Sequence, residues 1–220
     1  MTDQNSLEHS EKMDKVYEWQ VKIYDLTRKY YLLGRDHLID HLDPAPGSAI
    51  LEVACGTGRN LVQMARRYPE CHLYGIDISN HMIEHAKEKI TAAGLSDRIS
   101  LAWGDACAFD PQPVFGRTDF DQVVFSYSLS MIPDWPGAMR QGLKITAPDG
   151  RMSLVDFGQQ DGLPRWFRKG LYAWLDKFHV TPRAEMDDVL KELAVEFARP
   201  AQITSLYRDY AHFGQIGPKT

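Results

Sequence analysis

Residues 49–157 alternate between short apolar segments and segments with helical spacing, and this alternation limits the possible fold more than any other feature. The helical segments carry apolar residues at three- and four-residue steps. We expect strands at 49–53, 72–76, 99–102, 121–126 and 152–156. Strands that alternate with helices form a parallel sheet covered on both faces. The sequence therefore predicts an α/β fold with a doubly wound, mostly parallel sheet.

The segments on either side of this core differ from it. Apolar residues at helical spacing within 13–42 predict N-terminal helices that cap the core at 45–157. After the core, 163–195 is expected to be a helical insertion. The segment 201–217 contains two strand-like runs that are close enough to form a terminal hairpin at the sheet edge. No linker divides the chain, so we expect 1–220 to be a single domain.

Composition excludes several classes of protein. The formal net charge of −5 argues against a nucleic-acid binder, which usually carries a basic excess. No apolar run approaches the roughly 18 residues of a membrane span. The polar, acidic N-terminus resembles neither a secretory signal nor a transit peptide. The three cysteines are widely spaced and show no metal-ligand pattern, so we expect a cytoplasmic protein without a metal. The oligomeric state stays open.

Residues 49–60, AILEVACGTGRN, carry the most chemical information. A strand that enters a glycine turn and then a helix lets backbone N–H groups approach a ligand closely. The acidic Glu52 near the end of the strand indicates a ligand with a hydroxyl or cationic group. The segment therefore predicts a nucleoside-cofactor site. Cys55 is expected to be a small buried residue of the turn, not a nucleophile.

The next strand ends carry matching chemistry. Ligands of doubly wound sheets lie across the carboxyl ends of the strands. Asp77 can accept hydrogen bonds from both ribose hydroxyls, and Ile78 can lie on a purine face. Asp105 can accept from an exocyclic amine, and the N–H of Ala106 can face a ring nitrogen. As an alternative, either aspartate could be a helix cap or a loop residue. The candidate cofactor-binding residues are Glu52, Ala54, Gly56, Gly58, Asp77, Ile78, Asp105, Ala106 and Ser126.

These motifs occur in a recognisable order. ILEVACGTG, YGIDIS, WGDA, FDQVVFSYS and LKITAPDGRMSLVDF together resemble the class I S-adenosylmethionine-dependent methyltransferases. The resemblance implies a seven-stranded, Rossmann-like sheet whose last strand is antiparallel. It also implies S-adenosyl-L-methionine as cofactor and S-adenosyl-L-homocysteine as product. Ala54 stands where the family more often has glycine.

A nicotinamide-dependent dehydrogenase would share the glycine turn. The fourth-strand motif and the Pro-Asp-Gly turn before the fifth strand favour methyl transfer instead. A Tyr-x-x-x-Lys pair, which a short-chain dehydrogenase would need, does not occur at a suitable position. A non-catalytic binding module is a further alternative, and the intact Glu52, Gly56, Gly58 and Asp77 argue against it.

Three regions outside the core suggest the methyl acceptor. The segment 22–39 is rich in tyrosine and arginine and is expected to be helical, either covering the cofactor or packing its aromatic residues on the core. The segment 205–217 could reach the acceptor from the terminal hairpin, and His212 in it is expected to be a satisfied sheet residue, not a base. The candidate substrate-binding residues are Arg28, Tyr31, Arg35 and Tyr207.

The third region, 163–183, has five Lys or Arg residues against one acid, Asp176, together with several large apolar residues. A basic, tryptophan-rich amphipathic helix suits a membrane surface. The alternatives are a helix that covers the sheet edge or a contact between subunits. The candidate membrane-contact residues are Arg165, Trp166, Phe167, Arg168 and Lys169.

The flanking motifs narrow the resemblance. YDLTRKYYLLGRD, CGTGRN, SYSLSMIPDW and WFRKGLYAWLDKFHVTPR together resemble the bacterial betaine-lipid (diacylglycerylhomoserine) N-methyltransferases and related phospholipid N-methyltransferases. This implies three methyl transfers that convert diacylglycerylhomoserine to diacylglyceryl-N,N,N-trimethylhomoserine. It also implies peripheral association with the inner face of the membrane, where the lipid substrate lies.

The betaine-lipid resemblance assigns roles to individual residues. Arg28 or Arg35 would pair with the homoserine carboxylate. Tyr24 and Tyr127, the candidate catalytic residues, would orient and desolvate the amine, and tyrosine faces, including Tyr31, can hold a quaternary ammonium. A phosphatidylethanolamine N-methyltransferase and a soluble small-molecule methyltransferase remain alternatives.

Overall fold

A computed structural model of the chain describes residues 31–178 and 180–219. The chain divides into two units, Met1–Leu33 and Gly34–Thr220. All the helices and strands described below belong to the second unit. The predicted N-terminal helices within 13–42 lie outside the described residues as far as residue 30.

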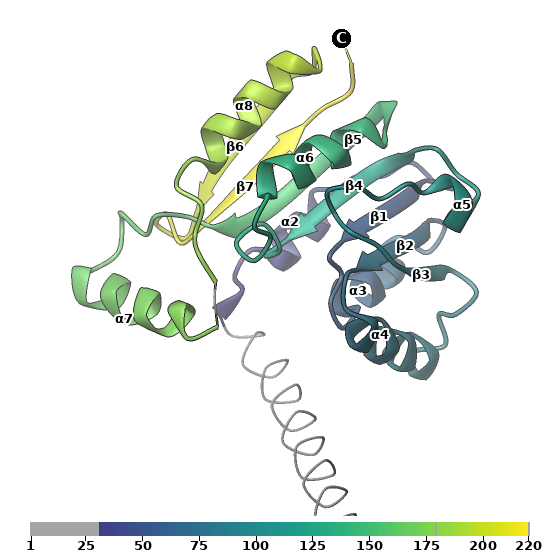
Figure 1. Ribbon diagram of the computed structural model, residues 1–220, viewed down its shortest axis with the longest axis horizontal. Helices are drawn as coiled ribbons and strands as arrows, with labels where there is room; N and C mark the ends of the chain where they lie inside the picture. The colour runs from purple at the N-terminus through teal and green to yellow at the C-terminus, as the bar shows by residue number, and fades with distance from the viewer. Residues whose placement is uncertain (1–30, 179, 220) are drawn as a thin grey trace, which may run out of the picture. The chain divides into compact units, whose positions relative to one another are not determined.

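The second unit is built on a seven-stranded sheet with the strand order β3-β2-β1-β4-β5-β7-β6 (Figure 1). Neighbouring strands from β3 to β5 pair in parallel, and β7 runs antiparallel to both of its neighbours. The doubly wound sheet and its antiparallel last strand are thus confirmed. The strands are β1 Ala49–Val53, β2 His72–Asp77, β3 Ile99–Trp103, β4 Phe120–Ser126, β5 Thr146–Phe157, β6 Ala201–Leu206 and β7 Ala211–Ile216.

Helices connect the strands. The helix after β2 is capped at both ends, because the Ser79 hydroxyl accepts from the Met82 N–H at 3.3 Å and Gly94 follows the C-cap with a φ of 68°. The four-residue helix after Pro111 has no periodic pattern and was not predicted. The helices are α2 Arg35–Asp40, α3 Arg59–Arg67, α4 Asn80–Ala92, α5 Gln112–Phe115, α6 Trp135–Lys144, α7 Arg165–Asp176 and α8 Met186–Glu196.

The main hydrophobic core lies between the central strands and helices α6 and α8. All five residues of β1 are buried, as expected for a strand that is covered on both faces. Leu51, Val123 and Phe125 are fully buried there and belong to the same cluster as Met139 of α6 and Leu190 of α8. This packing fixes the ends of β1 and β4, where the candidate site begins.

The start of β5 differs from the prediction. The strand was expected to begin after a Pro148-Asp149-Gly150 turn, but β5 begins at Thr146. Thr146 pairs with Phe120 and the next pair is Arg151 with Gln122, so the register shifts between them. The turn residues are therefore accommodated as an irregularity inside a longer strand.

Helix α7 lies apart from the sheet in Figure 1, whereas α8 covers it. Leu175 is the one buried residue of α7, while α8 buries Met186, Leu190, Leu193 and Ala194. The expected helical insertion thus consists of two helices with different environments. Among the described residues, no helix combines the length and apolar character needed to cross a membrane.

Candidate active site

The turn after β1 places backbone groups at the carboxyl edge of the sheet. Ala54, Gly56 and Gly58 all have positive φ angles, of 55°, 53° and 71°. A Cβ atom on Gly58 would lie 3.0 Å from the Ala86 Cβ, so glycine lets α3 approach α4 here. Ala54 adopts a left-handed backbone conformation that is easiest for glycine.

Glu52 is a buried carboxylate with one oxygen unused. Its side chain is 2% exposed, and Oε1 accepts from the Asn60 Nδ2 at 2.7 Å. Oε2 is buried and has no hydrogen-bond partner among the described residues. Burial raises the pKa of Glu52 to about 7, although Asn60, Arg35 and Arg59 act in the opposite direction. A cationic ligand group would satisfy Oε2 and stabilise the charged carboxylate.

A chain of hydrogen bonds orients the partner of Glu52. Arg59 donates from Nη2 to the Asp36 Oδ1 at 2.8 Å and from Nη1 to the Asn60 Oδ1 at 3.1 Å. The Asn60 amide oxygen is thereby engaged, so its NH₂ group points to Glu52. Asn60 was not among the candidate residues of the sequence. Its place directly after the glycine turn was the available signal.

Asp77 at the end of β2 joins two turns. Its Oδ2 accepts from the Gly56 N–H at 2.8 Å, and its Oδ1 accepts from the Ser79 N–H at 2.9 Å. Each carboxylate oxygen retains acceptor capacity for a ribose hydroxyl. The helix-cap alternative fails for this residue, because Ser79 caps α4.

An apolar surface adjoins Asp77. Ile78 is 64% exposed and Trp103, at the end of β3, is 55% exposed. The Trp103 Nε1 donates to the Ile78 carbonyl oxygen at 2.8 Å, which holds the two residues together. Half-buried Asp105 follows, and its Oδ1 accepts from the Cys107 N–H at 2.9 Å. Trp103 was not a candidate in the sequence, because only the fold brings the end of β3 next to the residue that follows β2.

The end of β4 forms the opposite side of the strand-end region. The Ser126 Oγ is buried without a hydrogen-bond partner among the described residues. Tyr127 is 4% exposed, has a φ of 54°, and packs edge-on against Phe157 at 4.7 Å between ring centroids. Burial, and secondly the charge of Asp156, raises the pKa of Tyr127 well above its usual value. Tyr127 therefore suits orientation and desolvation better than proton abstraction.

Two of the candidate substrate-binding residues lie near Tyr127. A Cβ atom on Gly34, the residue before α2, would lie 3.8 Å from the Tyr207 ring, so the N-terminus of α2 and the β6–β7 turn are neighbours. The charges of Arg35 and Tyr207 both act on the ionisation of Tyr127. Tyr207 is 53% exposed. Tyr24 and Arg28 lie outside the described residues, and the half-buried Tyr31 belongs to the first unit.

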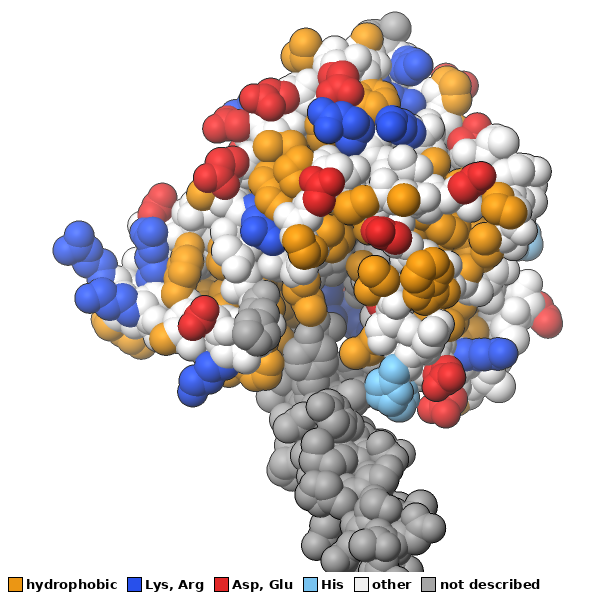
Figure 2. Space-filling view, in the orientation of Figure 1, with side chains coloured by type: hydrophobic (Ala, Val, Ile, Leu, Met, Phe, Trp, Pro, Cys, Tyr) orange, Lys and Arg blue, Asp and Glu red, His pale blue; other side chains and the backbone are white. Residues whose placement is uncertain are grey.

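The candidate membrane-contact residues lie on α7. Trp166 is 75% exposed, and Arg165 and Lys169 are exposed as well. Figure 2 shows Lys and Arg side chains gathered at the α7 end of this face. Arg168 is turned toward the preceding loop, where its Nη1 pairs with the Asp161 Oδ1 at 2.7 Å.

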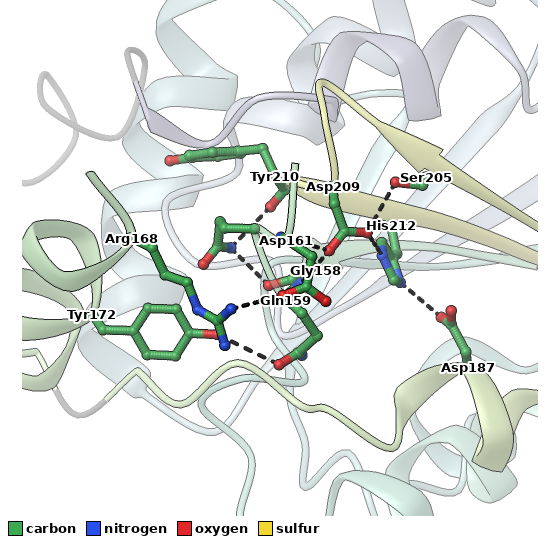
Figure 3. Close-up of polar contacts among 11 residues, drawn as sticks. Gly158, Gln159, Asp161, Arg168, Tyr172, Asp187, Ser205, Asp209, Tyr210 and His212 are labelled. Atoms are coloured by element: carbon green, nitrogen blue, oxygen red, sulfur yellow. Dashed lines mark hydrogen bonds and ion pairs between the residues drawn. The ribbon is translucent and has the colours of Figure 1, made fainter. Parts of the chain in front are cut away.

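A polar network connects α7 and α8 to the terminal hairpin (Figure 3). His212 lies between the Asp187 Oδ1 at 2.9 Å and the Asp209 Oδ1 at 2.6 Å. These carboxylates, Asp187 first, raise the pKa of His212 to about 9 despite the burial of the ring. The Asp209 Oδ2 also accepts from the Asp161 N–H at 3.2 Å. His212 is thus a satisfied residue of the sheet, as expected.

Within 31–178 and 180–219, no group of three or more His, Cys, Asp or Glu side chains could hold a metal ion.

Comparisons with known proteins agree with this geometry. Residues 50–150 match a family described as a methyltransferase domain. The chain is 28% identical over 162 residues to a demethylmenaquinone methyltransferase of Listeria monocytogenes, covering 71% of this chain and 66% of the relative. It is 31% identical over 153 residues to a nocamycin O-methyltransferase of Saccharothrix syringae, covering 69% and 53%. The matched part spans less than two thirds of the length of either relative.

Solved structures show the same fold. The apo form of the S-adenosylmethionine-dependent methyltransferase SibL matches with a TM-score of 0.67 at 20% identity, covering 90% of this chain and 58% of that one. Phosphoethanolamine N-methyltransferase 2 of Haemonchus contortus, in complex with S-adenosyl-L-methionine, matches with a TM-score of 0.66 at 15% identity, covering 84% and 52%.

Proposed function

Because residues 50–150 of this chain match a methyltransferase domain, we propose that the chain methylates the amine of a membrane lipid. S-adenosylmethionine is the cofactor of the domain. Its sulfonium supplies an electrophilic methyl group when bound. The residues of this chain then have three tasks, which are to hold the cofactor, to orient the acceptor and to exclude water.

The unpartnered Oε2 of buried Glu52 carries the proposal for the cofactor. A buried carboxylate oxygen without a hydrogen-bond partner is disfavoured, and the cationic amino group of S-adenosylmethionine would compensate it. Asp77 would accept from the ribose, and Ile78 with Trp103 would offer an apolar surface to the adenine. Asp105 with Ala106 would face the adenine edge. Ala54, Gly56 and Gly58 would keep the turn close to the ligand.

The acceptor would lie at the end of β4. Tyr127 is buried there, and Arg35 and Tyr207 are near it. A buried, apolar setting lowers the pKa of an amine, so the acceptor would be held in its reactive, unprotonated form. The Arg35 guanidinium could pair with a carboxylate of the headgroup. These features fit diacylglycerylhomoserine, which would receive three methyl groups in succession.

The surface of α7 supports a lipid acceptor. An exposed tryptophan beside Arg165 and Lys169 combines an interfacial anchor with positive charge. The exposed charges would be attracted to anionic lipid although the whole chain is acidic. Docking through α7 would bring the protein to the membrane surface that holds the substrate. Phe167 and Arg168 belong to the same helix turn but are half-buried.

A quinone acceptor is the second candidate. The observation that favours it is the similarity to demethylmenaquinone methyltransferase over 71% of the chain. Phosphatidylethanolamine and a soluble small molecule are further acceptors to be compared in the same assay.

The experiment is a transfer assay with radiolabelled S-adenosylmethionine and the full chain. Anionic vesicles contain diacylglycerylhomoserine, phosphatidylethanolamine or demethylmenaquinone, and a vesicle without acceptor is the blank. We expect label in the homoserine lipid only, and Glu52→Gln should reduce it. Label in demethylmenaquinone alone would refute the lipid-amine proposal and support the second candidate.

A further inference from the structure

The loop that follows β4 is held by a segment from far along the chain. Arg183 donates from Nε to the Leu129 carbonyl at 3.1 Å and from Nη2 to the Ile132 carbonyl at 2.9 Å. The Thr181 N–H donates to the Ser130 carbonyl at 3.0 Å. Three carbonyl groups of the β4 loop, which we define as residues 128–132, are therefore fixed by residues 181–183.

The same loop is held from the sheet side by Asp156. This residue lies near the end of β5 and is 1% exposed. Its Oδ2 accepts from the Ser130 N–H at 3.1 Å, and its Oδ1 accepts from the Phe157 N–H at 2.8 Å. Both backbone groups of Ser130 are thus engaged, the N–H by Asp156 and the carbonyl by Thr181.

This double attachment matters because the β4 loop begins next to Tyr127. Tyr127 has a left-handed backbone conformation, with a φ of 54°. A non-glycine residue holds such a conformation only when its surroundings enforce it. The Tyr127 N–H donates to the Val155 carbonyl at 2.8 Å on one side, and the β4 loop continues on the other. The contacts of Arg183 therefore help to fix the backbone from which the Tyr127 side chain projects.

The segment that carries Arg183 also follows α7. At its other end, α7 is attached to the loop after β5, through Arg168 with Asp161 and through the Tyr172 hydroxyl with the Gln159 Oε1 at 3.5 Å (Figure 3). Two strand-end loops on the acceptor side are thus connected to one exposed helix. Arg183 makes the closer connection, with two hydrogen bonds to carbonyl groups.

We propose that Arg183 is a positioning residue for methyl transfer, which fixes the β4 loop and thereby the Tyr127 side chain against the acceptor. This rests on the function proposed above, and it adds a residue outside the strand-end motifs. Arg183 acts on the acceptor side, whereas the cofactor contacts of Glu52 and Asp77 belong to β1 and β2. Its removal should therefore affect catalysis more than cofactor binding.

The test compares Arg183→Ala and Arg183→Lys with the wild type. Arg140→Ala is the matched control, because Arg140 pairs with Glu196 at the surface between α6 and α8. With diacylglycerylhomoserine in vesicles, Arg183→Ala should lower kcat by up to about 100-fold, the loss expected when a reactant is misplaced by about 1 Å. The lysine variant should retain part of the activity, since one ammonium can still reach a carbonyl. Calorimetry should give wild-type affinity for S-adenosylmethionine in every variant.

Amide hydrogen exchange gives an independent readout that needs no acceptor. The Ser130 N–H donates to Asp156, and the N–H groups of Met131 and Ile132 donate to the Ser128 carbonyl at 3.0 and 3.1 Å. These amides should exchange faster in Arg183→Ala and not in Arg140→Ala. Unchanged exchange, or equal losses of cofactor affinity and kcat, would overturn the positioning role. An inactive wild type would contradict the proposed function instead.

Discussion

Replacing Glu52 with glutamine separates the effect of this side chain on stability from its effect on binding. The pKa of Glu52 is about 7, whereas its ordinary value is 4.5. This gap of about 2.5 pH units, at about 1.4 kcal/mol per unit, makes the charged carboxylate in the folded apoprotein unfavourable by about 3.5 kcal/mol. Because the pKa of Glu52 is raised in the folded state, the contribution of its protonated carboxyl to the free energy of unfolding is fully present below pH 4.5. This contribution is lost as the pH rises through 7.

Urea unfolding between pH 4.5 and 8 measures the stability effect. Glutamine keeps an oxygen that can accept from the Asn60 Nδ2 but cannot ionise. The variant should therefore equal the wild type near pH 4.5 and exceed it at pH 8 by up to about 3 kcal/mol. Glu192→Gln on the exposed face of α8 is the control and should follow the wild type at every pH.

Calorimetry measures the effect of Glu52 on the affinity for S-adenosylmethionine and on the protons released on binding. At pH 7 about half of the Glu52 carboxyls carry a proton, which a cationic amino group would displace. In two buffers with different ionisation enthalpies, the wild type should release about half a proton per S-adenosylmethionine bound. Glu52→Gln should release none from this site and bind about 10- to 100-fold more weakly, as expected for a lost hydrogen bond to a charged group. A variant that is less stable at pH 8, or that binds with wild-type affinity, would refute the assigned role.

Three further changes test other parts of the structure. Gly58→Ala should lower the free energy of unfolding by about 1–2 kcal/mol, because the position has a positive φ and a Cβ would lie 3.0 Å from the Ala86 Cβ; urea titration checks this. Trp166→Ala should weaken sedimentation with anionic vesicles at unchanged melting temperature, whereas Val195→Ala, at another exposed apolar residue, should not; equal binding by both would contradict a membrane contact at α7. His212→Ala should lower the melting temperature more at pH 6 than at pH 10. The pKa of His212 is raised to about 9, so the charged ring stabilises the fold fully below pH 6.5, and this contribution is lost as the pH rises through 9. An equal loss at both pH values would contradict the charged pairing.

The cofactor-binding side of the site could be predicted from the sequence because its candidate residues lie at or directly after the ends of recognisable strands. Glu52 and Asp77 each stand near the end of an apolar segment, and parallel strands bring those ends to one edge of the sheet. The strands that carry the motifs lie side by side in the order β3-β2-β1-β4, so their carboxyl ends lie along one edge of the sheet. The predicted start of β5 was wrong because a turn signal cannot show that pairing resumes on both sides of it.

The roles of Asn60, Trp103 and Arg183 could not be predicted, because each depends on a contact across elements. Arg183 was counted among the basic residues of an amphipathic segment, yet its guanidinium donates to carbonyl groups more than fifty residues earlier in the chain. Side-chain type and spacing do not reveal such a contact. The surroundings of Tyr127 could not be predicted for the same reason, since the charged residues that act on it come from α2, β5 and the terminal hairpin.

Mass spectrometry of lipids from a host that expresses the protein tests the central claim most directly. The host is examined with and without diacylglycerylhomoserine, a host without the protein serves as the inactive reference, and Glu52→Gln should give reduced methylation. We predict a gain of three methyl groups on the homoserine lipid that requires both the precursor and the wild-type protein. An unchanged precursor beside newly methylated quinone would contradict it.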